Sequence, residues 1–385
     1  MYRLLLIVLA TFALVAGVSA AEADNYEQAR ELSQQLGKPI LIKFFVPSCD
    51  HCDKATEEFA VKSDIHKALE SVVYMTVDCS ELEELADEYE IGGVYYPVFL
   101  LANSDGEEIF RWIGYTTSYA FVNNLGKALA DPTTVKERES SFRDAPTFDN
   151  AVRLAKYYVD AQNYVGAIEY YRRAQELDQS GRADFSFDIL TNSCNAAWTD
   201  QIVFDDVLPV ADTILVRGSS ANIVKTAQLM ARLARKMGET DRIAGYLTAG
   251  VDASVNSANP ETQKTHKLLL ADQALHVNAD TTGAVRIKKA TLGENYESDL
   301  NRVYDLVRWC AERKINLEES ERYARLLASR ASGDTFKAGI LGTLALVLEA
   351  RGKVEEAIPF VEEALELDPA NKSYPSQLER LHETQ

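Results

Sequence analysis

Two patterns of apolar and polar residues divide the chain. Between about residues 38 and 130, short apolar runs rich in branched and aromatic residues alternate with polar, helix-compatible stretches. After about residue 146 the short runs almost vanish, and apolar residues recur at the three- and four-residue spacing of helices to the end of the chain. The pattern predicts an α/β domain followed by an all-α region.

The first region reads as strand, helix, strand, hairpin and helix. Strands are expected at 40–46, 72–77, 97–101 and 109–113, and Asn103–Gly106 has the composition of the hairpin turn between the last two. Helical spacing is expected at 22–37, 49–60, 65–69, 81–89 and 121–129. This order predicts a sheet with both parallel and antiparallel neighbours, covered by helices.

The second region contains an internal repeat. Residues 148–181 and 338–371 carry small and large apolar residues at matching positions, and both end alike, at Ala174–Asp178 and Ala364–Asp368. Both copies resemble tetratricopeptide repeats, which implies paired helices that stack into an array. Because an array needs at least about three repeats, we expect degenerate helices within 183–335 to complete the stack, as three or four weak repeats.

Five cysteines raise the question of chemistry. Cys49 and Cys52 follow the strand at 40–46 and begin a helix, where free N–H groups and the helix dipole favour a thiolate. Cys79, Cys194 and Cys310 are single and have apolar neighbours, which predicts inert thiols.

Three interpretations of the Cys49/Cys52 pair are open. Two cysteines at this spacing form half of many zinc sites, but no second pair of cysteines or histidines follows. A purely structural disulfide is a second interpretation. Dithiol chemistry is the interpretation that the strand–helix setting favours, and it requires sulfur atoms that solvent can reach.

The region around the pair resembles the thioredoxin family. The resemblance rests on the strand, Cys-x-x-Cys and helix order, on Asp78, on Tyr96-Pro97 and on the segment 98–114. It implies a thioredoxin-like fold, with Cys49 as the attacking thiolate and Cys52 as the resolving thiol. It also implies that the redox-active Cys49–Cys52 disulfide replaces any separate cofactor, and that no metal is bound.

The resemblance assigns further roles near the pair. His51 corresponds to a histidine of the more oxidising family members, which include protein disulfide isomerases, and would stabilise the thiolate, whereas Asp50 would oppose it. Pro97 would be cis, and the backbone of Tyr96 would bind the client chain. These residues predict protein thiols or disulfides as clients.

The chain also departs from the family pattern. Lys43 occupies the strand position of a buried acid, where it either lowers the thiol pKa values or points to solvent. Ser48 replaces the usual tryptophan, and 91–96 is longer than usual, with Tyr95 adding aromatic surface. The departures suggest a dedicated client.

The chain begins with a candidate export signal. Arg3, an apolar run from Leu4 to Val18 and then small residues predict a signal peptide over 1–20 and no membrane span after its removal. We therefore expect an exported protein, periplasmic or extracellular. The net charge of −19 argues against nucleic-acid partners.

The expected organisation is a signal peptide (1–20), a thioredoxin-like domain (21–131), a linker (132–147) and a tetratricopeptide-like region (148–385). It favours an exported thiol–disulfide oxidoreductase whose helical region binds a partner or client. The alternative is a non-catalytic interaction scaffold with a vestigial thioredoxin-like domain. Paired tyrosines on the first repeat either line a binding surface or, as we favour, pack between helices: Tyr157, Tyr158, Tyr170 and Tyr171.

Overall fold

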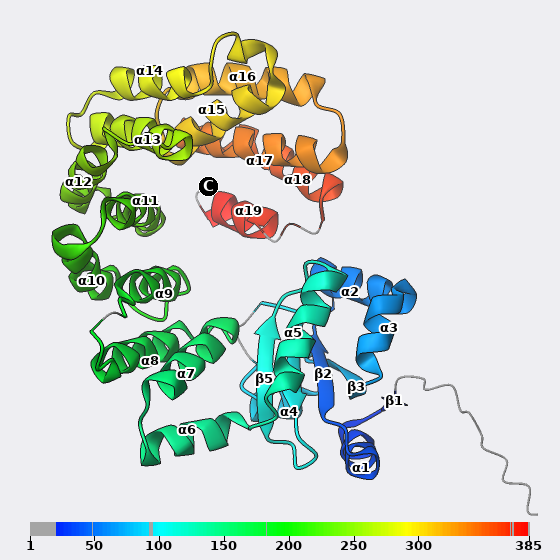
Figure 1. Cartoon of the computed structure of the whole chain (residues 1–385). Coiled ribbons are helices and arrows are strands. Elements are labelled where there is room, and N and C mark those ends of the chain that lie inside the picture. Colours follow the sequence, from blue (N-terminus) through cyan, green and yellow to red (C-terminus); the bar gives the residue numbers. More distant parts are fainter. Residues whose placement is uncertain are drawn as a thin grey trace, which may run out of the picture. The chain divides into compact units, whose positions relative to one another are not determined.

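The computed structural model describes residues 21–47, 49–91, 95–181, 183–369, 371 and 373–383. The expected signal peptide, Ser48 and most of the loop before Tyr96 lie outside these residues. The chain divides into two compact units between Ser141 and Phe142, inside the expected linker (Figure 1). We call them unit 1 and unit 2.

Unit 1 is built on a sheet in which sequence neighbours are not always spatial neighbours. The strand order is β1-β3-β2-β4-β5, where β2 pairs parallel with β3 and antiparallel with β4. The strands are β1 (Ala21–Glu22), β2 (Ile40–Phe45), β3 (Val73–Asp78), β4 (Val98–Ala102) and β5 (Glu108–Ile113). Four of them lie where the sequence predicts strands. β1 was not predicted because two residues carry no periodic signal.

Helices cover both faces of the sheet, and β2 sorts its side chains between them. Ile40, Ile42 and Phe44 pack in the cluster that contains residues of α1 and α4, whereas Leu41 packs with α2, α3 and α5. Because strand side chains alternate, Lys43 shares the face of Leu41 and lies against α2. The helices of unit 1 are α1 (Tyr26–Leu36), α2 (Asp50–Val61), α3 (Ser63–Leu69), α4 (Glu83–Glu88) and α5 (Ser118–Ala130).

The expected linker contains a helix, α6 (Val135–Asp144), which spans the division between the units. Arg138 on this helix is 8% exposed and donates hydrogen bonds to the carbonyl oxygens of Ile109 and Asp131. The sequence did not predict α6, because few of its side chains are apolar and it therefore shows no apolar periodicity.

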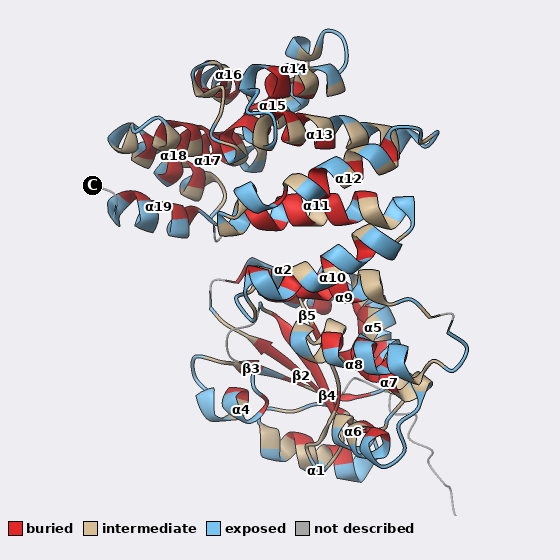
Figure 2. Cartoon of the chain, turned by 90° about the vertical axis from the view of Figure 1, so that its left-hand side faces the viewer, coloured by how far each residue is buried: buried red, intermediate tan, exposed pale blue. Residues whose placement is uncertain are grey.

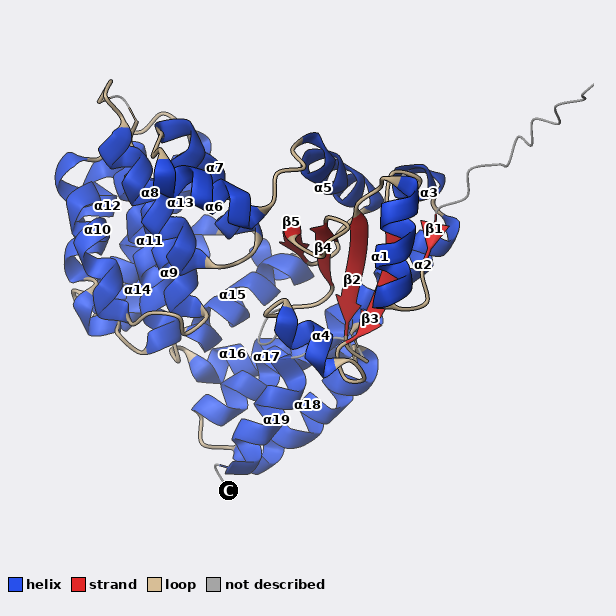
Figure 3. Cartoon of the chain, turned by 90° about the horizontal axis from the view of Figure 1, so that it is seen from below, coloured by secondary structure: helices blue, strands red, loops and turns tan. Residues whose placement is uncertain are grey.

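The helices of unit 2 are joined by loops and turns, and its described residues include no strand (Figure 3). Successive helices pair along the chain, and the pairs form a curved double layer in which α9 and α11 lie on the inner side and α10 and α12 on the outer side (Figure 1). The helices are α7 (Phe148–Asp160), α8 (Tyr164–Leu177), α9 (Ser186–Trp198), α10 (Phe204–Arg217), α11 (Ser220–Met237), α12 (Ala244–Ser254), α13 (Pro260–His276), α14 (Thr281–Thr291), α15 (Leu300–Glu312), α16 (Leu317–Arg330), α17 (Asp334–Ala350), α18 (Val354–Leu367) and α19 (Ser373–Glu383).

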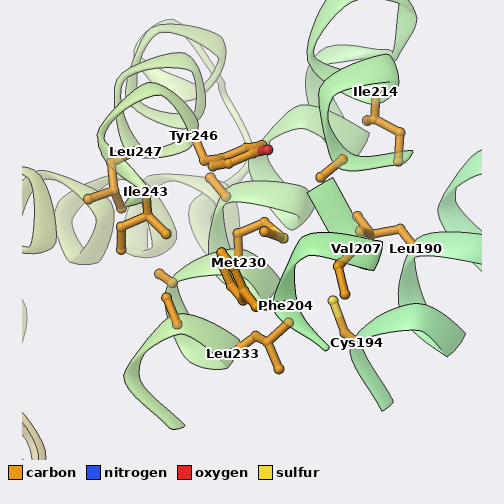
Figure 4. Close-up of a cluster of buried hydrophobic side chains, with 14 of the residues drawn as sticks. Leu190, Cys194, Phe204, Val207, Ile214, Met230, Leu233, Ile243, Tyr246 and Leu247 are labelled. Carbon is orange, nitrogen blue, oxygen red and sulfur yellow. The ribbon is translucent and has the colours of Figure 1, made fainter. Parts of the chain in front are cut away.

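Helix α11 buries a stripe against its neighbours and leaves another face exposed (Figure 2). Side chains from α9 to α12 converge in one apolar cluster (Figure 4), which includes Leu190, Cys194, Phe204, Val207, Met230, Leu233, Tyr246 and Leu247. The degenerate segment expected within 183–335 therefore does supply stacked helices.

The paired tyrosines of the first repeat pack between helices, as favoured. Tyr157 and Tyr171 are 6% and 7% exposed. Tyr158 and Tyr170 stack with ring centroids 5.4 Å apart. These four side chains stabilise the α7/α8 pair. They therefore do not form the partner-binding surface that was the alternative expectation.

Candidate active site

Cys49 is the N-cap of α2, as expected from its place between strand and helix. Its backbone is extended, with φ −113° and ψ 102°, and its Sγ accepts the N–H of Cys52 at 3.3 Å. Its carbonyl oxygen accepts the N–H groups of Cys52 and Asp53 at 2.8 and 2.9 Å. The sulfur therefore lies at the positive end of the helix, where a thiolate is stabilised.

Cys49 and Cys52 form a disulfide, with an S–S distance of 2.10 Å and Cα atoms 5.2 Å apart. Each residue is only 2% exposed. The expectation that solvent reaches these sulfurs is wrong for this state, because the N-cap conformation turns the Cys49 side chain back onto the first turn of α2.

The two residues between the cysteines lie on the outside of α2. Asp50 and His51 are both exposed in its first turn. An aspartate there interacts favourably with the helix dipole. The structure places both beside the pair, so their expected influence on the thiolate is electrostatic.

Lys43 is buried beneath the first turns of α2, at 2% exposure, which excludes a solvent-facing side chain. Its Nζ donates hydrogen bonds to the carbonyl oxygen of Cys52 at 3.1 Å and to Oγ1 of Thr56 at 2.5 Å. It also lies 5.6 and 5.9 Å from the ring centroids of Phe45 and Phe59. Within the described residues, no carboxylate lies within 4.0 Å of it.

This environment changes the acidity of the lysine. Burial lowers the pKa of Lys43 from 10.5 to about 8, and the charge of Asp53 opposes the decrease. The side chain lines a cavity of about 550 Å³ on this side of the sheet, together with Thr56, Phe59 and Tyr74. Lys43 can therefore gain or lose a proton near neutral pH, one hydrogen bond away from the backbone of Cys52.

Tyr96-Pro97 is a cis peptide bond, as the resemblance implied. The cis bond lies at the same end of the sheet as Cys49. The strand β4, which follows it, begins at Val98, and Val98 pairs with Phe44 near the end of β2. Within the described residues, no backbone hydrogen bond uses the N–H or C=O of Tyr96.

Cys79 makes a contact that the sequence did not reveal. This half-buried thiol follows β3, its N–H donates to the carbonyl oxygen of Phe45 at 2.9 Å, and its side chain interacts electrostatically with that of Tyr96. Burial raises the pKa of the Cys79 thiol and raises that of Tyr96 to about 12, so both keep their protons at neutral pH. Only the β3–β2–β4 pairing brings these two residues together. Cys194 and Cys310 are buried in unit 2, as expected.

The described residues contain no group of three or more histidine, cysteine, aspartate or glutamate side chains placed to hold a metal ion. None of their helices has both the length and the apolar character needed to cross a membrane.

Comparisons with known proteins agree with this geometry. Residues 26–129 match the family model of the thioredoxin-like domain. Unit 1 contains a thioredoxin-like domain. Residues 338–371, which form most of α17 and α18, match the model of the tetratricopeptide repeat, so the second expected copy is confirmed.

Two relatives illustrate how far the similarity extends. Protein disulfide-isomerase A3 of Gallus gallus is 30% identical over 181 residues, which cover 46% of this chain and 34% of that protein. The chloroplastic thioredoxin-like protein HCF164 of Oryza sativa subsp. japonica is 28% identical over 120 residues, covering 31% and 44%. The chain thus spans less than half of either relative.

A solved structure titled "TPR2AB-domain:pHSP90-complex of yeast Sti1" covers 61% of this chain at 14% identity, with a TM-score of 0.23. A similarity this low supports no argument. The α/β thioredoxin-like domain followed by a tetratricopeptide-like helical region therefore rests on the family models and on the fold itself.

Proposed function

We propose that this chain is an exported thiol–disulfide oxidoreductase whose helical unit binds a protein partner or client. The proposal is carried by Cys49, whose sulfur caps α2 and is bonded to Cys52 at the end of a strand that pairs with the strand after cis-Pro97. The relatives named above are thioredoxin-like and disulfide-isomerase proteins, which supports the same class of reaction.

The proposed exchange moves two electrons between this dithiol and a client disulfide. In the reducing direction, the Cys49 thiolate attacks one client sulfur, forms a mixed disulfide and releases a client thiolate. The Cys52 thiolate then attacks the Cys49 sulfur, which releases the second client thiolate and restores the Cys49–Cys52 bond. The reverse sequence oxidises the client.

We assign separate roles in this exchange to the residues around the cysteine pair. The free N–H and C=O of Tyr96 would pair with the client backbone as an added strand. Lys43 has a pKa of about 8 and would take part in ionising Cys52, whose carbonyl it contacts. Asp50 and His51 would set the stability of the Cys49 thiolate from outside, with opposite signs.

A second candidate function follows from the burial of the pair. At 2% exposure for each cysteine, the disulfide is as protected as a structural bond. In this alternative the thioredoxin-like domain is a rigid element, and the helical unit of a non-catalytic scaffold carries the function. We favour the first candidate because a purely structural bond requires neither a buried lysine nor free backbone groups beside it.

The two candidates differ in a standard assay. We expect the wild-type full chain to catalyse insulin reduction by dithiothreitol, and Cys49→Ser to be inactive. Cys194→Ala, a cysteine substitution in the unit 2 core, is the matched control and should retain activity. An inactive wild type whose disulfide resists dithiothreitol until the chain unfolds would support the scaffold.

The place of action is also part of the proposal. The basic start and apolar run within 1–20 support export to the periplasm or outside the cell, an oxidising compartment in which such exchange is useful. Expression of the full chain with a C-terminal tag, followed by fractionation and N-terminal sequencing, tests this directly. An uncleaved chain in the cytoplasm would contradict it.

A further inference from the structure

The inner face of α9 and α11 carries a concentration of cations that is unusual for this chain. The whole chain has 59 acidic and 40 basic residues, yet α11 contains four basic residues and no acidic one. Arg235 is accounted for, because it pairs with the buried carboxylate of Asp272. The other three are Lys225, Arg232 and Lys236, and all three are exposed.

These three cations lie over aromatic rings of α9. Nζ of Lys225 is 5.3 Å from the ring centroid of Phe187. The guanidinium of Arg232 and Nζ of Lys236 are 4.8 and 5.8 Å from the centroid of Trp198. We call these five residues the basic aromatic strip. Within the described residues, none of its cations has a carboxylate within 4.0 Å.

The positive charges of the basic aromatic strip are not balanced by neighbouring carboxylates. Arg232 and Lys236 are one helical turn apart and share one tryptophan, and like charges at this spacing destabilise a helix. The acid of α9, Asp188, offers no compensation, because its opposite charge is Lys156 on α7. A carboxylate placed between Arg232 and Lys236 would relieve the repulsion and would complete two charge-assisted hydrogen bonds.

Beside Trp198 and Arg232 lies a small cavity of about 100 Å³. It is lined by Cys194, Asn195, Leu229 and Leu233 together with Trp198 and Arg232. Since a water molecule takes about 30 Å³ of liquid volume, the cavity holds a few waters or one small apolar side chain. Cys194 and Leu233 also belong to the core cluster of Figure 4, which fixes α9 against α11.

We propose that the basic aromatic strip binds an extended acidic peptide segment, with an acidic residue, an apolar residue and a second acidic residue at alternate positions. The proposal deepens the partner-binding part of the proposed function and rests on it. One carboxylate pairs with Lys225, the apolar side chain enters the cavity, and the other carboxylate lies between Arg232 and Lys236.

The spacing of the strip selects this pattern. The midpoint between Arg232 and Lys236 lies nine residues beyond Lys225, which is about 13 Å along a helix. In an extended chain, residues four apart lie on the same side and also span about 13 Å. Leu229 lies between the two anchor points, where the intervening side chain would enter. Nucleic acid is disfavoured because the chain's net charge of −19 repels phosphates outside the strip.

The test uses the full chain and a fluorescein-labelled peptide, Gly-Glu-Ser-Leu-Ser-Glu-Gly, followed by fluorescence anisotropy. We expect saturable binding at low salt that weakens between 50 and 300 mM NaCl, because exposed charge pairs are screened. A peptide with both Glu replaced by Gln, and one with Leu replaced by Ser, should each bind at least about tenfold more weakly.

Substitutions in the protein locate the site. The double variant Arg232→Glu/Lys236→Glu should raise the Kd at least about tenfold. The control, Arg172→Glu/Arg217→Glu, makes the same change in net charge at exposed positions of α8 and α10 and should change the Kd less than twofold. Far-UV circular dichroism checks that both fold. If the first does not, the Gln peptide tests the same contacts with an unaltered protein.

Several results would overturn the proposal. These are no binding at 50 mM NaCl, equal binding of the Gln peptide, equal weakening by both double variants, or tighter binding of a single-stranded oligodeoxynucleotide than of the peptide. Cys49→Ser should bind the peptide normally, and Arg232→Glu/Lys236→Glu should still reduce insulin. Failure of the strip is therefore distinguishable from failure of the redox chemistry.

Discussion

The cores of the two units differ in how far apart along the chain their contacting segments lie. In unit 1, the central strand β2 pairs with strands that follow it by about 30 and 55 residues, so the core forms only when distant segments meet. In unit 2, each helix packs mainly on the next helix along the chain. Unit 1 can therefore bring a cysteine pair, a lysine and a cis-proline strand to one place, whereas unit 2 presents a long series of helix faces.

The units also treat buried charge differently. In unit 2, the buried carboxylate of Asp272 receives Nε and Nη2 of Arg313 at 2.7 and 3.1 Å, and Arg235 at 3.3 Å. In unit 1, Lys43 is equally buried but has only neutral hydrogen-bond partners and aromatic rings. A buried charge without a counter-ion reduces stability. That it lies beneath the cysteine pair is what a functional role predicts.

Truncation of a core side chain should separate the two architectures most clearly. Phe99→Ala removes a fully buried ring that stacks on Phe59 and Trp112, which should cost unit 1 about 3–5 kcal/mol. Met230→Ala should cost the α9–α12 cluster about 2–5 kcal/mol.

Hydrogen exchange followed by mass spectrometry distinguishes the consequences. Phe99→Ala should lower protection throughout β2, β4 and β5 together. Met230→Ala should lower it in α9–α12 and leave α17 and α18 protected. If Met230→Ala weakened every helix of unit 2 equally, the neighbour-by-neighbour description of that unit would be wrong.

Replacement of the unpaired lysine should stabilise unit 1. Because one pKa unit corresponds to about 1.4 kcal/mol, a lysine whose pKa falls from 10.5 to about 8 costs a few kcal/mol when protonated. Lys43→Met removes this cost but also two hydrogen bonds, so we expect a net gain of about 1–2 kcal/mol at pH 7.

The pH dependence provides the check. Below pH 8 the lysine is protonated in both the folded and the unfolded states, so the full cost is present. Between pH 8 and 10.5 the unfolded chain binds more protons, and the wild type gains stability relative to Lys43→Met. Urea unfolding at pH 7 and pH 10 measures the difference. A gap that is constant with pH would show that folding does not lower the pKa of Lys43.

The last comparison concerns close helix packing in unit 2. A Cβ added at Gly250 of α12 would lie 2.4 Å from Cβ of Ala227 on α11, so Gly250→Ala should destabilise by about 1–3 kcal/mol. Gly245, on the same helix, has open space around its added Cβ. Gly245→Ala should be neutral or stabilising by up to about 1 kcal/mol. Thermal unfolding monitored at 222 nm compares the two, and equal midpoints would argue against the α11–α12 contact.

Much of the fold was predictable because its signals are local. The apolar run at 40–46 and the turn at Asn103–Gly106 each specify an element from a few adjacent residues, and the Cys49–Cys52 spacing placed the pair at a helix start. The terminal repeat was equally clear. α6 escaped prediction because its helix is mostly polar, and β1 escaped because it is too short.

The features that could not be predicted from the sequence depend on contacts between residues that are far apart along the chain. The position of Lys43 under α2 follows from the alternation of β2, but its lack of a counter-ion depends on every neighbouring element. The interaction of Tyr96 with Cys79 requires the β3–β2–β4 order, and the 2% exposure of the cysteine pair depends on tertiary packing. The basic aromatic strip joins residues of α9 and α11 that are about 38 positions apart, so neither helix alone revealed it.

The central claim is that the buried Cys49–Cys52 disulfide can be reduced and re-formed in the folded protein. Equilibration of the full chain with glutathione buffers, followed by thiol trapping and mass spectrometry, measures this directly, with circular dichroism to show that the chain remains folded. The account predicts reversible exchange at a potential between about −270 and −120 mV, the range of thioredoxin-like oxidoreductases. A disulfide that stays intact in these buffers until denaturant is added would contradict it.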